Sequence, residues 1–302
     1  MSFSDRVRKS LVFKSPDVEE IVDMYWHRRF AAVGTALILD TGIRPDQVTL
    51  ASLIVGWTAS AVFAVTIFST LLPEIVGYPL TAALVFFSVV LDCMDGQLAR
   101  ATGGGTRMGR ILDGVVDAFV LVPIYVLVGV DIWMRFGWGV FAVAVVAGLS
   151  TFMRTSVYDR VKSFYLAHTL PTANADGVET MDEVLAHYAE IKKTGTLFEK
   201  FLMSMYVDGQ LKYGRLFTGR QEDAIAHDVT DETIAAFRAR FRVSMRLMSF
   251  MGLGTHMFFI YASILLMPWW GQATSAVQLM FAVLGIPLLI FAIIRAKALA
   301  NA

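Results

Sequence analysis

The sequence predicts an all-α integral membrane protein with six transmembrane helices. Of its 302 residues, 56% are hydrophobic and 17% are charged, which is too apolar for an ordinary soluble domain. Charged residues are absent from five long runs, and the last run is long enough for two helices because about 20 residues cross a bilayer. Lys and Arg gather between alternate runs, as in a polytopic membrane protein.

The N-terminal segment, residues 1–45, precedes the first run and is mixed in character. Tyr25, Trp26 and Arg28 stand beside an apolar stretch that is too short to span a membrane. This combination predicts an amphipathic helix lying in the membrane interface. Pro45 then suits the first turn of the first spanning helix, where its missing N–H does no harm.

The remaining chain divides into a bundle of four helices, a polar insert and a final helix pair. The insert, between helices 4 and 5, is expected to be cytoplasmic and helical. In the last uncharged run, 247–294, the segment MPWWGQA supplies Pro, Gly and interfacial Trp for a hairpin. The predicted parts are helices 1–4 within 46–158 (over 47–73, 75–91, 118–130 and 136–153), the insert at 159–241, and helices 5–6 within 242–302.

The basic residues indicate the orientation. All but one of the 26 Lys and Arg residues fall on one side of the predicted membrane, and Arg135 alone falls on the other. The positive-inside rule then places both termini in the cytoplasm. The net charge of zero conceals this asymmetry, and we expect no nucleic-acid binding. Asp131, near the outer end of helix 3, is expected to be solvated, and His256 in helix 5 to be a packing residue.

Four aspartates lie at the cytoplasmic ends of helices 2 and 3. Asp92 and Asp95 are three residues apart and Asp113 and Asp117 are four apart, so each pair shares one face of a helix. The short loop ATGGGTRM makes the two helices antiparallel neighbours. Carboxylates inside a membrane cost a few kcal/mol each if left uncompensated. Converging oxygen donors suit Mg²⁺ or Mn²⁺, and two such ions can stabilise both oxygens of a displacement at phosphorus.

The neighbours of the aspartates fit a ligand that carries phosphate. Gly96 and Gly109 remove side chains where a diphosphate or a flat base would approach the backbone. Arg100 lies on the helix face of Asp92 and Asp95, where it can reach a phosphate or the carboxylates themselves.

The pattern DxxDGxxAR, eight further residues and GxxxDxxxD runs without a gap from Asp92 to Asp117. It resembles the motif of the CDP-alcohol phosphotransferase family. The segment GIRPDQVT resembles the family's start of helix 1, and GGGTRMG resembles the corresponding loop of its bacterial phosphatidylinositol-phosphate synthases. The likeness is strongest over residues 40–160 and weakens in the polar insert.

This resemblance implies roles for the motif residues. Asp92, Asp95, Asp113 and Asp117 would hold two Mg²⁺ or Mn²⁺ ions, and Asp117 would take the proton from the acceptor hydroxyl. An alcohol would attack the β-phosphorus of a CDP-alcohol and release CMP, in a homodimer of the bacterial cell membrane whose active sites face the cytoplasm. The residues implied around the CDP moiety are Asp46, Gln47, Val48, Thr49, Gly96, Ala99, Arg100, Thr106 and Gly109.

The expected donor is CDP-diacylglycerol, and the expected acceptor is a polar alcohol such as inositol phosphate or glycerol phosphate. Arg154 and Arg246, nearest the membrane ends of helices 4 and 5, are candidates for the acceptor phosphate; the alternative is juxtamembrane anchoring by positive charge. Ala118 stands where an Arg commonly follows the last aspartate in the inositol-phosphate branch, which leaves the acceptor open.

Three other functions compete. A CDP-choline or CDP-ethanolamine phosphotransferase with a diacylglycerol acceptor would carry the same motif. A Mg²⁺-dependent prenyltransferase would separate its aspartate motifs by several helices, whereas 17 residues lie between Asp95 and Asp113. An ion transporter would need polar residues along the other helices, and helices 1, 5 and 6 lack charges across their cores.

Overall fold

The computed structural model describes an all-helical protein, as the sequence predicts. The chain divides into two compact units. The first comprises Met1–Phe13, Glu20–Phe152 and Leu253–Ile286, and the second comprises Lys14–Glu19, Met153–Gly252 and Pro287–Ala302. The described residues are 2–11, 15–103, 107–169, 181–197, 199–201, 203–204, 207, 230–271, 285–287 and 290–295.

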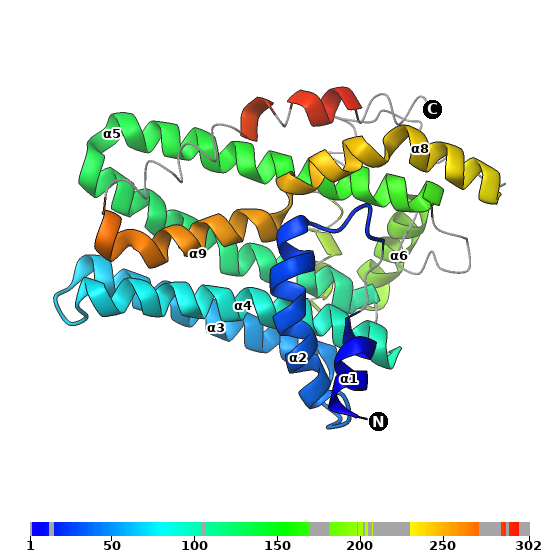
Figure 1. The fold of residues 1–302 in the computed structure, drawn as a ribbon, viewed down its shortest axis with the longest axis horizontal. Helices are drawn as coiled ribbons and strands as arrows, with labels where there is room; N and C mark the ends of the chain where they lie inside the picture. The colour runs from blue at the N-terminus through cyan, green and yellow to red at the C-terminus, as the bar shows by residue number, and fades with distance from the viewer. Residues whose placement is uncertain are drawn as a thin grey trace. The chain divides into compact units, whose positions relative to one another are not determined.

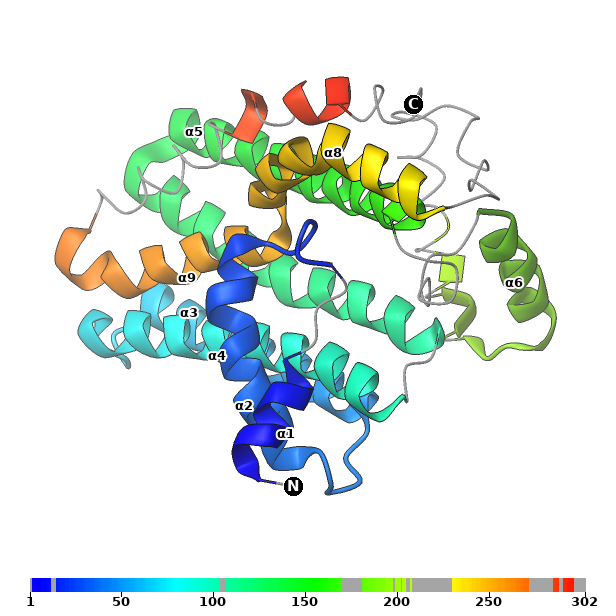
Figure 2. The ribbon, with the colours of Figure 1, turned by 45° about the vertical axis from the view of Figure 1, so that its right-hand side comes forward.

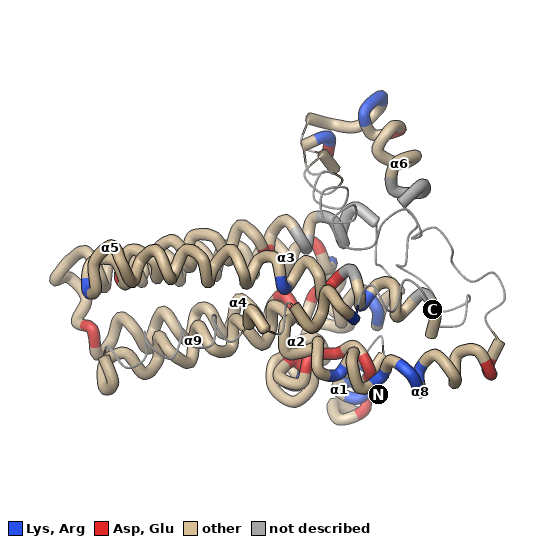
Figure 3. The backbone as a smooth tube through the Cα atoms, turned by 90° about the horizontal axis from the view of Figure 1, so that it is seen from above, with Lys and Arg blue, Asp and Glu red and all other residues tan. Residues whose placement is uncertain are grey.

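Long apolar helices dominate the first unit. Among the described residues, four helical stretches are long and apolar enough to cross a membrane: Pro45–Phe68, Glu74–Thr102, Val115–Leu166 and Asp231–Trp270. In Figure 1, α3 (Pro45–Phe68), α4 (Glu74–Thr102) and α9 (Leu253–Trp270) run alongside one another. The middle parts of these helices are almost free of charged residues in Figure 3, as burial in lipid requires.

Helix α5 (Arg107–Thr169) contains a sharp turn that separates two limbs. Gly137 has φ 76° and ψ −172°, a conformation that glycine adopts without steric cost, and the chain reverses there in Figures 1 and 2. The two limbs coincide with predicted helices 3 and 4, while α3, α4 and α9 coincide with helices 1, 2 and 5. Predicted helix 6 lies mostly outside the described residues, so the count of six stays a prediction.

Small residues let the helices of the first unit approach closely. A Cβ atom placed on Gly56 of α3 would lie 2.6 Å from Val120 Cγ1 of α5 and 3.0 Å from Ser88 Oγ of α4. Such small-residue contacts are typical of helix packing in membranes. The core between α3, α4, α5 and α9 consists of Ala59, Phe63, Tyr78, Ala82, Val85, Ile124, Met257, Ile260, Tyr261, Ile264 and Met267.

Two polar residues in this unit test sequence expectations. Asp131 is buried rather than solvated: its carboxylate accepts a hydrogen bond from Arg135 Nε at 2.8 Å, and Arg135 Nη2 donates to Tyr78 Oη at 2.6 Å. The expectation of a solvated Asp131 is therefore wrong, because Arg135 one turn later neutralises it. His256 is buried and stacks on Tyr125 with ring centroids 5.3 Å apart, as a packing residue does.

The N-terminal segment forms α1 (Phe3–Ser10), a π-helical turn η1 (Asp23–His27) and α2 (Arg28–Ile38). In Figures 1 and 2, α2 crosses α3 and α4 steeply. Its contacts with α4 include a hydrogen bond from Gln97 Nε2 to the Arg28 carbonyl at 2.9 Å. They also include close packing of Met94, whose Sδ lies 2.5 Å from the position of a Cβ on Gly34. That α2 lies in the membrane interface remains a prediction.

The second unit contains the end of α5, α6 (Met181–Thr194), α8 (Asp231–Met248) and the short η4 (Ser249–Met251). The predicted boundary of the insert at 158/159 falls within α5. The core of this unit consists of Val18, Val157, Tyr158, Val161, Tyr165, Leu166, Phe241, Met245, Met248, Met251 and Ala292.

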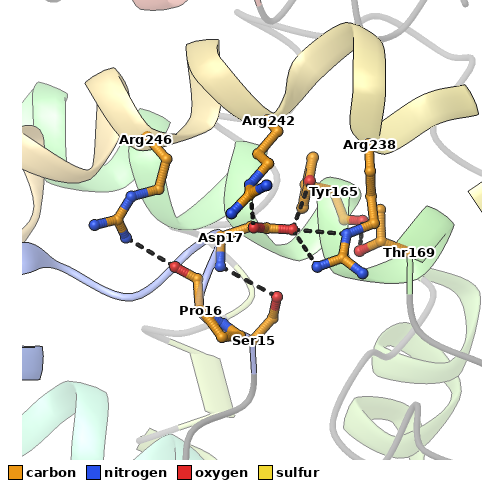
Figure 4. Close-up of polar contacts among 8 residues, drawn as sticks. All are labelled: Ser15, Pro16, Asp17, Tyr165, Thr169, Arg238, Arg242 and Arg246. Atoms are coloured by element: carbon orange, nitrogen blue, oxygen red, sulfur yellow. Dashed lines mark hydrogen bonds and ion pairs between the residues drawn. The ribbon is translucent and has the colours of Figure 1, made fainter. Parts of the chain in front are cut away.

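A buried carboxylate links the N-terminal segment of the second unit, residues 15–19, to α8 (Figure 4). Asp17, with its side chain 1% exposed, pairs with Arg238 at 2.7 Å and with Arg242 at 2.9 Å. Tyr165 Oη of α5 donates to the same carboxylate at 3.1 Å. Because Arg238 and Arg242 are one helical turn apart, one aspartate can engage both.

Candidate active site

The first aspartate pair lies in the last turns of α4. Asp95 is 4% exposed, and Asp92 is half-buried. The helix ends after Thr102, where Gly103 adopts φ 66° as its C-terminal cap, the usual role of glycine at that position. The motif aspartates therefore stand on regular helix rather than on a loop, which fixes the direction of their side chains.

The start of α3 lies beside these aspartates. Thr49 Oγ1 donates a hydrogen bond of 2.5 Å to Asp95 Oδ2, and the Thr49 side chain is as buried as that of Asp95. Gln47 Oε1 accepts the Arg44 backbone N–H at 3.0 Å and so helps to begin the helix. The structure thus brings the predicted Asp46 to Thr49 turn to the predicted carboxylates.

The four residues of that turn differ in exposure. Asp46 and Gln47 are exposed, whereas Val48 is buried in an apolar cluster with Ala31, Val90, Met94 and Leu98. A ligand in this region can reach the side chains of Asp46 and Gln47. Val48 supports the turn by packing.

Arg100 folds back over Gly96. Its Nη1 and Nη2 atoms lie 3.4 and 3.5 Å from the position that a Cβ on Gly96 would take. A Cβ on Gly96 would therefore be in ordinary van der Waals contact with the guanidinium, which lies along the helix face that carries the aspartates. Ala99 and Arg100 are both half-buried.

The second aspartate pair lies near the start of α5. Asp117 is half-buried, and the backbone after it is attached to α3, since Trp57 Nε1 donates to the Phe119 carbonyl at 3.1 Å. Gly109 and Asp113 also lie on the α5 helix, but the side chain of Asp113 and all of Thr106 fall outside the described residues.

The described part of the chain contains no group of three or more His, Cys, Asp or Glu side chains in an arrangement that could hold a metal ion. Asp113, the fourth member of the predicted set, is not among the side chains considered. The donors that are described, Asp92, Asp95 and Asp117, are all carboxylates, which are the ligands that Mg²⁺ and Mn²⁺ prefer. Their chemistry fits a hard cation.

The two candidate acceptor residues both belong to the second unit. Arg154, on α5, is 2% exposed. Arg246, on α8, donates from Nη1 to the Pro16 carbonyl at 2.8 Å (Figure 4) and to the Glu19 carbonyl at 2.8 Å. Sequence reasoning missed this structural contact because Pro16 is 230 positions away from Arg246.

The fold and site define a polytopic helical membrane protein with paired carboxylates at the ends of neighbouring helices. Residues 43–189 match the family model for CDP-alcohol phosphatidyltransferase, which confirms the resemblance that the motif predicts. The matched range contains α3, α4, the whole of α5 and all four aspartates.

Curated relatives carry the name phosphatidylinositol phosphate synthase. The chain is 36% identical over 127 residues to that of Mycobacteroides abscessus, covering 42% of this chain and 52% of the relative. It is 40% identical over 82 residues to that of Mycobacterium marinum, covering 26% and 30%, and 38% identical over 99 residues to that of Mycolicibacterium smegmatis, covering 33% and 40%. The matches thus span about half or less of each relative. No solved structure matches the chain significantly.

Proposed function

We propose that this protein transfers the phosphatidyl group of CDP-diacylglycerol to a polar alcohol and releases CMP. The observation that carries the proposal is the complete motif from Asp92 to Asp117, placed on adjoining helices within the matched residues 43–189. In the reaction, the acceptor oxygen forms a bond to the β-phosphorus while the bond from phosphorus to the CMP oxygen breaks. Such a transfer asks mainly for positioning and charge neutralisation.

Asp92, Asp95, Asp113 and Asp117 are the residues that would hold divalent cations, and we propose two ions of Mg²⁺ or Mn²⁺. When bound, these ions neutralise the negative charge of the diphosphate. Asp117 also accepts the proton that the acceptor hydroxyl loses, as a general base within hydrogen-bond reach does.

The CDP moiety is proposed to lie between the start of α3 and the end of α4. Asp46 and Gln47 supply exposed polar groups there, Arg100 supplies positive charge, and Gly96 supplies space. Thr106, Ala99 and Gly109 complete the proposed surroundings from the family resemblance.

For the acceptor we propose a phosphorylated polyol, because the curated relatives are named phosphatidylinositol phosphate synthase. Arg154 and Arg246 are the candidates for its phosphate: Arg154 is buried on α5, and Arg246 donates to two backbone carbonyls. Because Ala118 replaces the Arg that is common in the inositol-phosphate branch, both glycerol phosphate and inositol phosphate are candidate acceptors. We further propose that the protein has six transmembrane helices and forms a homodimer. We also propose that it lies in a bacterial cell membrane with its active site facing the cytoplasm.

A panel of CMP-release assays tests the proposed function. Purified protein in Mg²⁺ receives CDP-diacylglycerol with inositol phosphate, inositol, glycerol phosphate or serine, and in parallel CDP-choline or CDP-ethanolamine with diacylglycerol. We expect CMP only from CDP-diacylglycerol, and fastest with a phosphorylated acceptor. CMP from CDP-choline or CDP-ethanolamine alone would establish the alternative in which the lipid is the acceptor.

A further inference from the structure

We infer that Thr49 is a positioning residue that holds the Asp95 carboxylate in the orientation required to bind a divalent cation. The inference rests on the proposed function and gives it a residue that acts through a metal ligand. The family resemblance places Thr49 around the CDP moiety instead, so the two roles make different predictions.

The hydroxyl of Thr49 has one proton and two acceptors within reach. Oγ1 lies 2.5 Å from Asp95 Oδ2 and 3.2 Å from the Pro45 carbonyl. A carboxylate is the stronger acceptor and forms the shorter bonds, so the Thr49 hydroxyl donates its hydrogen bond to Asp95. Thr49 consequently has no proton left to donate to a nucleotide.

Burial makes this bond difficult to replace. Thr49 and Asp95 are each 4% exposed, so water cannot readily take the place of the hydroxyl. Partners that orient metal ligands in this way commonly change metal affinity by about 10- to 100-fold when they are removed.

Hydrogen bonds and close packing hold the part of α3 that contains Thr49. Ser52 Oγ donates to the Thr49 carbonyl at 2.7 Å, and Ser88 Oγ of α4 donates to the Ser52 carbonyl at 2.8 Å. One turn further along α3, Gly56 packs against Ser88 and Val120. The Ser88 and Gly56 contacts join α3 to α4 about two helical turns away from Asp95 and do not touch its carboxylate.

Direct measurement of Mn²⁺ binding separates the two roles. Purified wild type, Thr49→Val, Thr49→Ser and Ser88→Ala are titrated with Mn²⁺, and free Mn²⁺ is followed by electron paramagnetic resonance. We expect Thr49→Val to weaken Mn²⁺ binding about tenfold, because valine keeps the shape and loses the hydroxyl. Thr49→Ser, which restores the hydroxyl, should remain within about threefold of wild type. Ser88→Ala is the matched control, since it removes an α3–α4 hydrogen bond away from the aspartates.

Four results would overturn the inference: unchanged Mn²⁺ affinity in Thr49→Val, equal weakening in Thr49→Ser, equal weakening in Ser88→Ala, or no Mn²⁺ binding by wild type. If Thr49→Val does not fold, Thr49→Ala takes its place against Thr49→Ser. If Thr49→Val instead raises the KM for CDP-diacylglycerol and leaves the Mn²⁺ affinity unchanged, Thr49 contacts the CDP moiety and does not position Asp95. Wild type that binds Mn²⁺ but releases no CMP would refute the proposed function, and the binding comparison would still decide the role of Thr49.

Discussion

Individual aspartates of the motif have unequal surroundings, and this inequality suggests different tasks. Asp95 is buried and engaged by Thr49, which suits a ligand held in one orientation. Asp117 is half-buried on α5, where we propose that it meets the acceptor hydroxyl. A fixed ligand and an accessible base are both needed for phosphoryl transfer.

Replacement of Asp117 by Asn tests its role as the base. Asparagine keeps the size of the side chain but cannot take the proton, so we expect the rate of CMP release to fall by about 10²- to 10⁴-fold. Binding of CDP-diacylglycerol and Mn²⁺, measured on the same preparation, should weaken much less. CMP release by Asp117→Asn at the wild-type rate would show that Asp117 is not the base.

Residue spacing predicts part of this site. The intervals between Asp92, Asp95, Asp113 and Asp117 place each pair on one helix face, and the short loop makes the helices neighbours. The bond between Thr49 and Asp95 could not be predicted in this way, because the two residues are 46 positions apart and depend on the register of α3 against α4.

At the scale of the elements, the contact of α3 with α4 and α5 depends on Gly56, which has no side chain. We predict that Gly56→Ala lowers the unfolding midpoint of the purified protein, since the added Cβ would lie 2.6 Å from Val120 Cγ1. Such overpacking typically costs about 1–3 kcal/mol. The control is Gly139→Ala, where an added Cβ meets no atom within 4 Å. Equal midpoints for the two variants would contradict the packing.

The buried carboxylate of Asp17, which pairs with two arginines of α8, gives a second prediction at this scale. Asp17→Asn removes the charge that pairs with Arg238 and Arg242, and we expect a loss of about 1–3 kcal/mol in the free energy of unfolding. The matched control is Asp40→Asn, because Asp40 pairs with Arg6 at 2.7 Å while its side chain is 64% exposed. Exposed pairs contribute about 0–1 kcal/mol. A larger loss in the control than in Asp17→Asn would refute the structural role of Asp17.

The elements themselves are largely predictable from hydropathy, and their long-range pairings are not. The break between predicted helices 3 and 4 anticipates the turn of α5 at Gly137, because charged residues interrupt the apolar runs there. Nothing in the local pattern indicates that Asp17 lies against Arg238, which is 221 positions away. The burial of Asp131 was likewise missed, since its pairing with Arg135 is evident only once both residues lie on one helix.

For the whole molecule, composition and helix length together indicate an integral membrane protein. Four described helical stretches have the length and composition of membrane spans, and the family match covers residues 43–189. The distribution of Lys and Arg predicts that both termini face the cytoplasm. The substrates are less predictable, because the motif is proposed to bind the cytidine diphosphate that the possible donors share, and other residues would select the acceptor.

The most direct test of metal-dependent phosphatidyl transfer is CMP release by the purified protein in lipid nanodiscs containing CDP-diacylglycerol. With inositol phosphate or glycerol phosphate as acceptor, we predict release in Mg²⁺, no release in EDTA, and recovery when Mg²⁺ is restored. Asp92→Asn and Asp95→Asn should each reduce the rate by about 10²-fold or more, because each removes a charged ligand. CMP release that persists in EDTA, or that both variants sustain at the wild-type rate, would contradict the account.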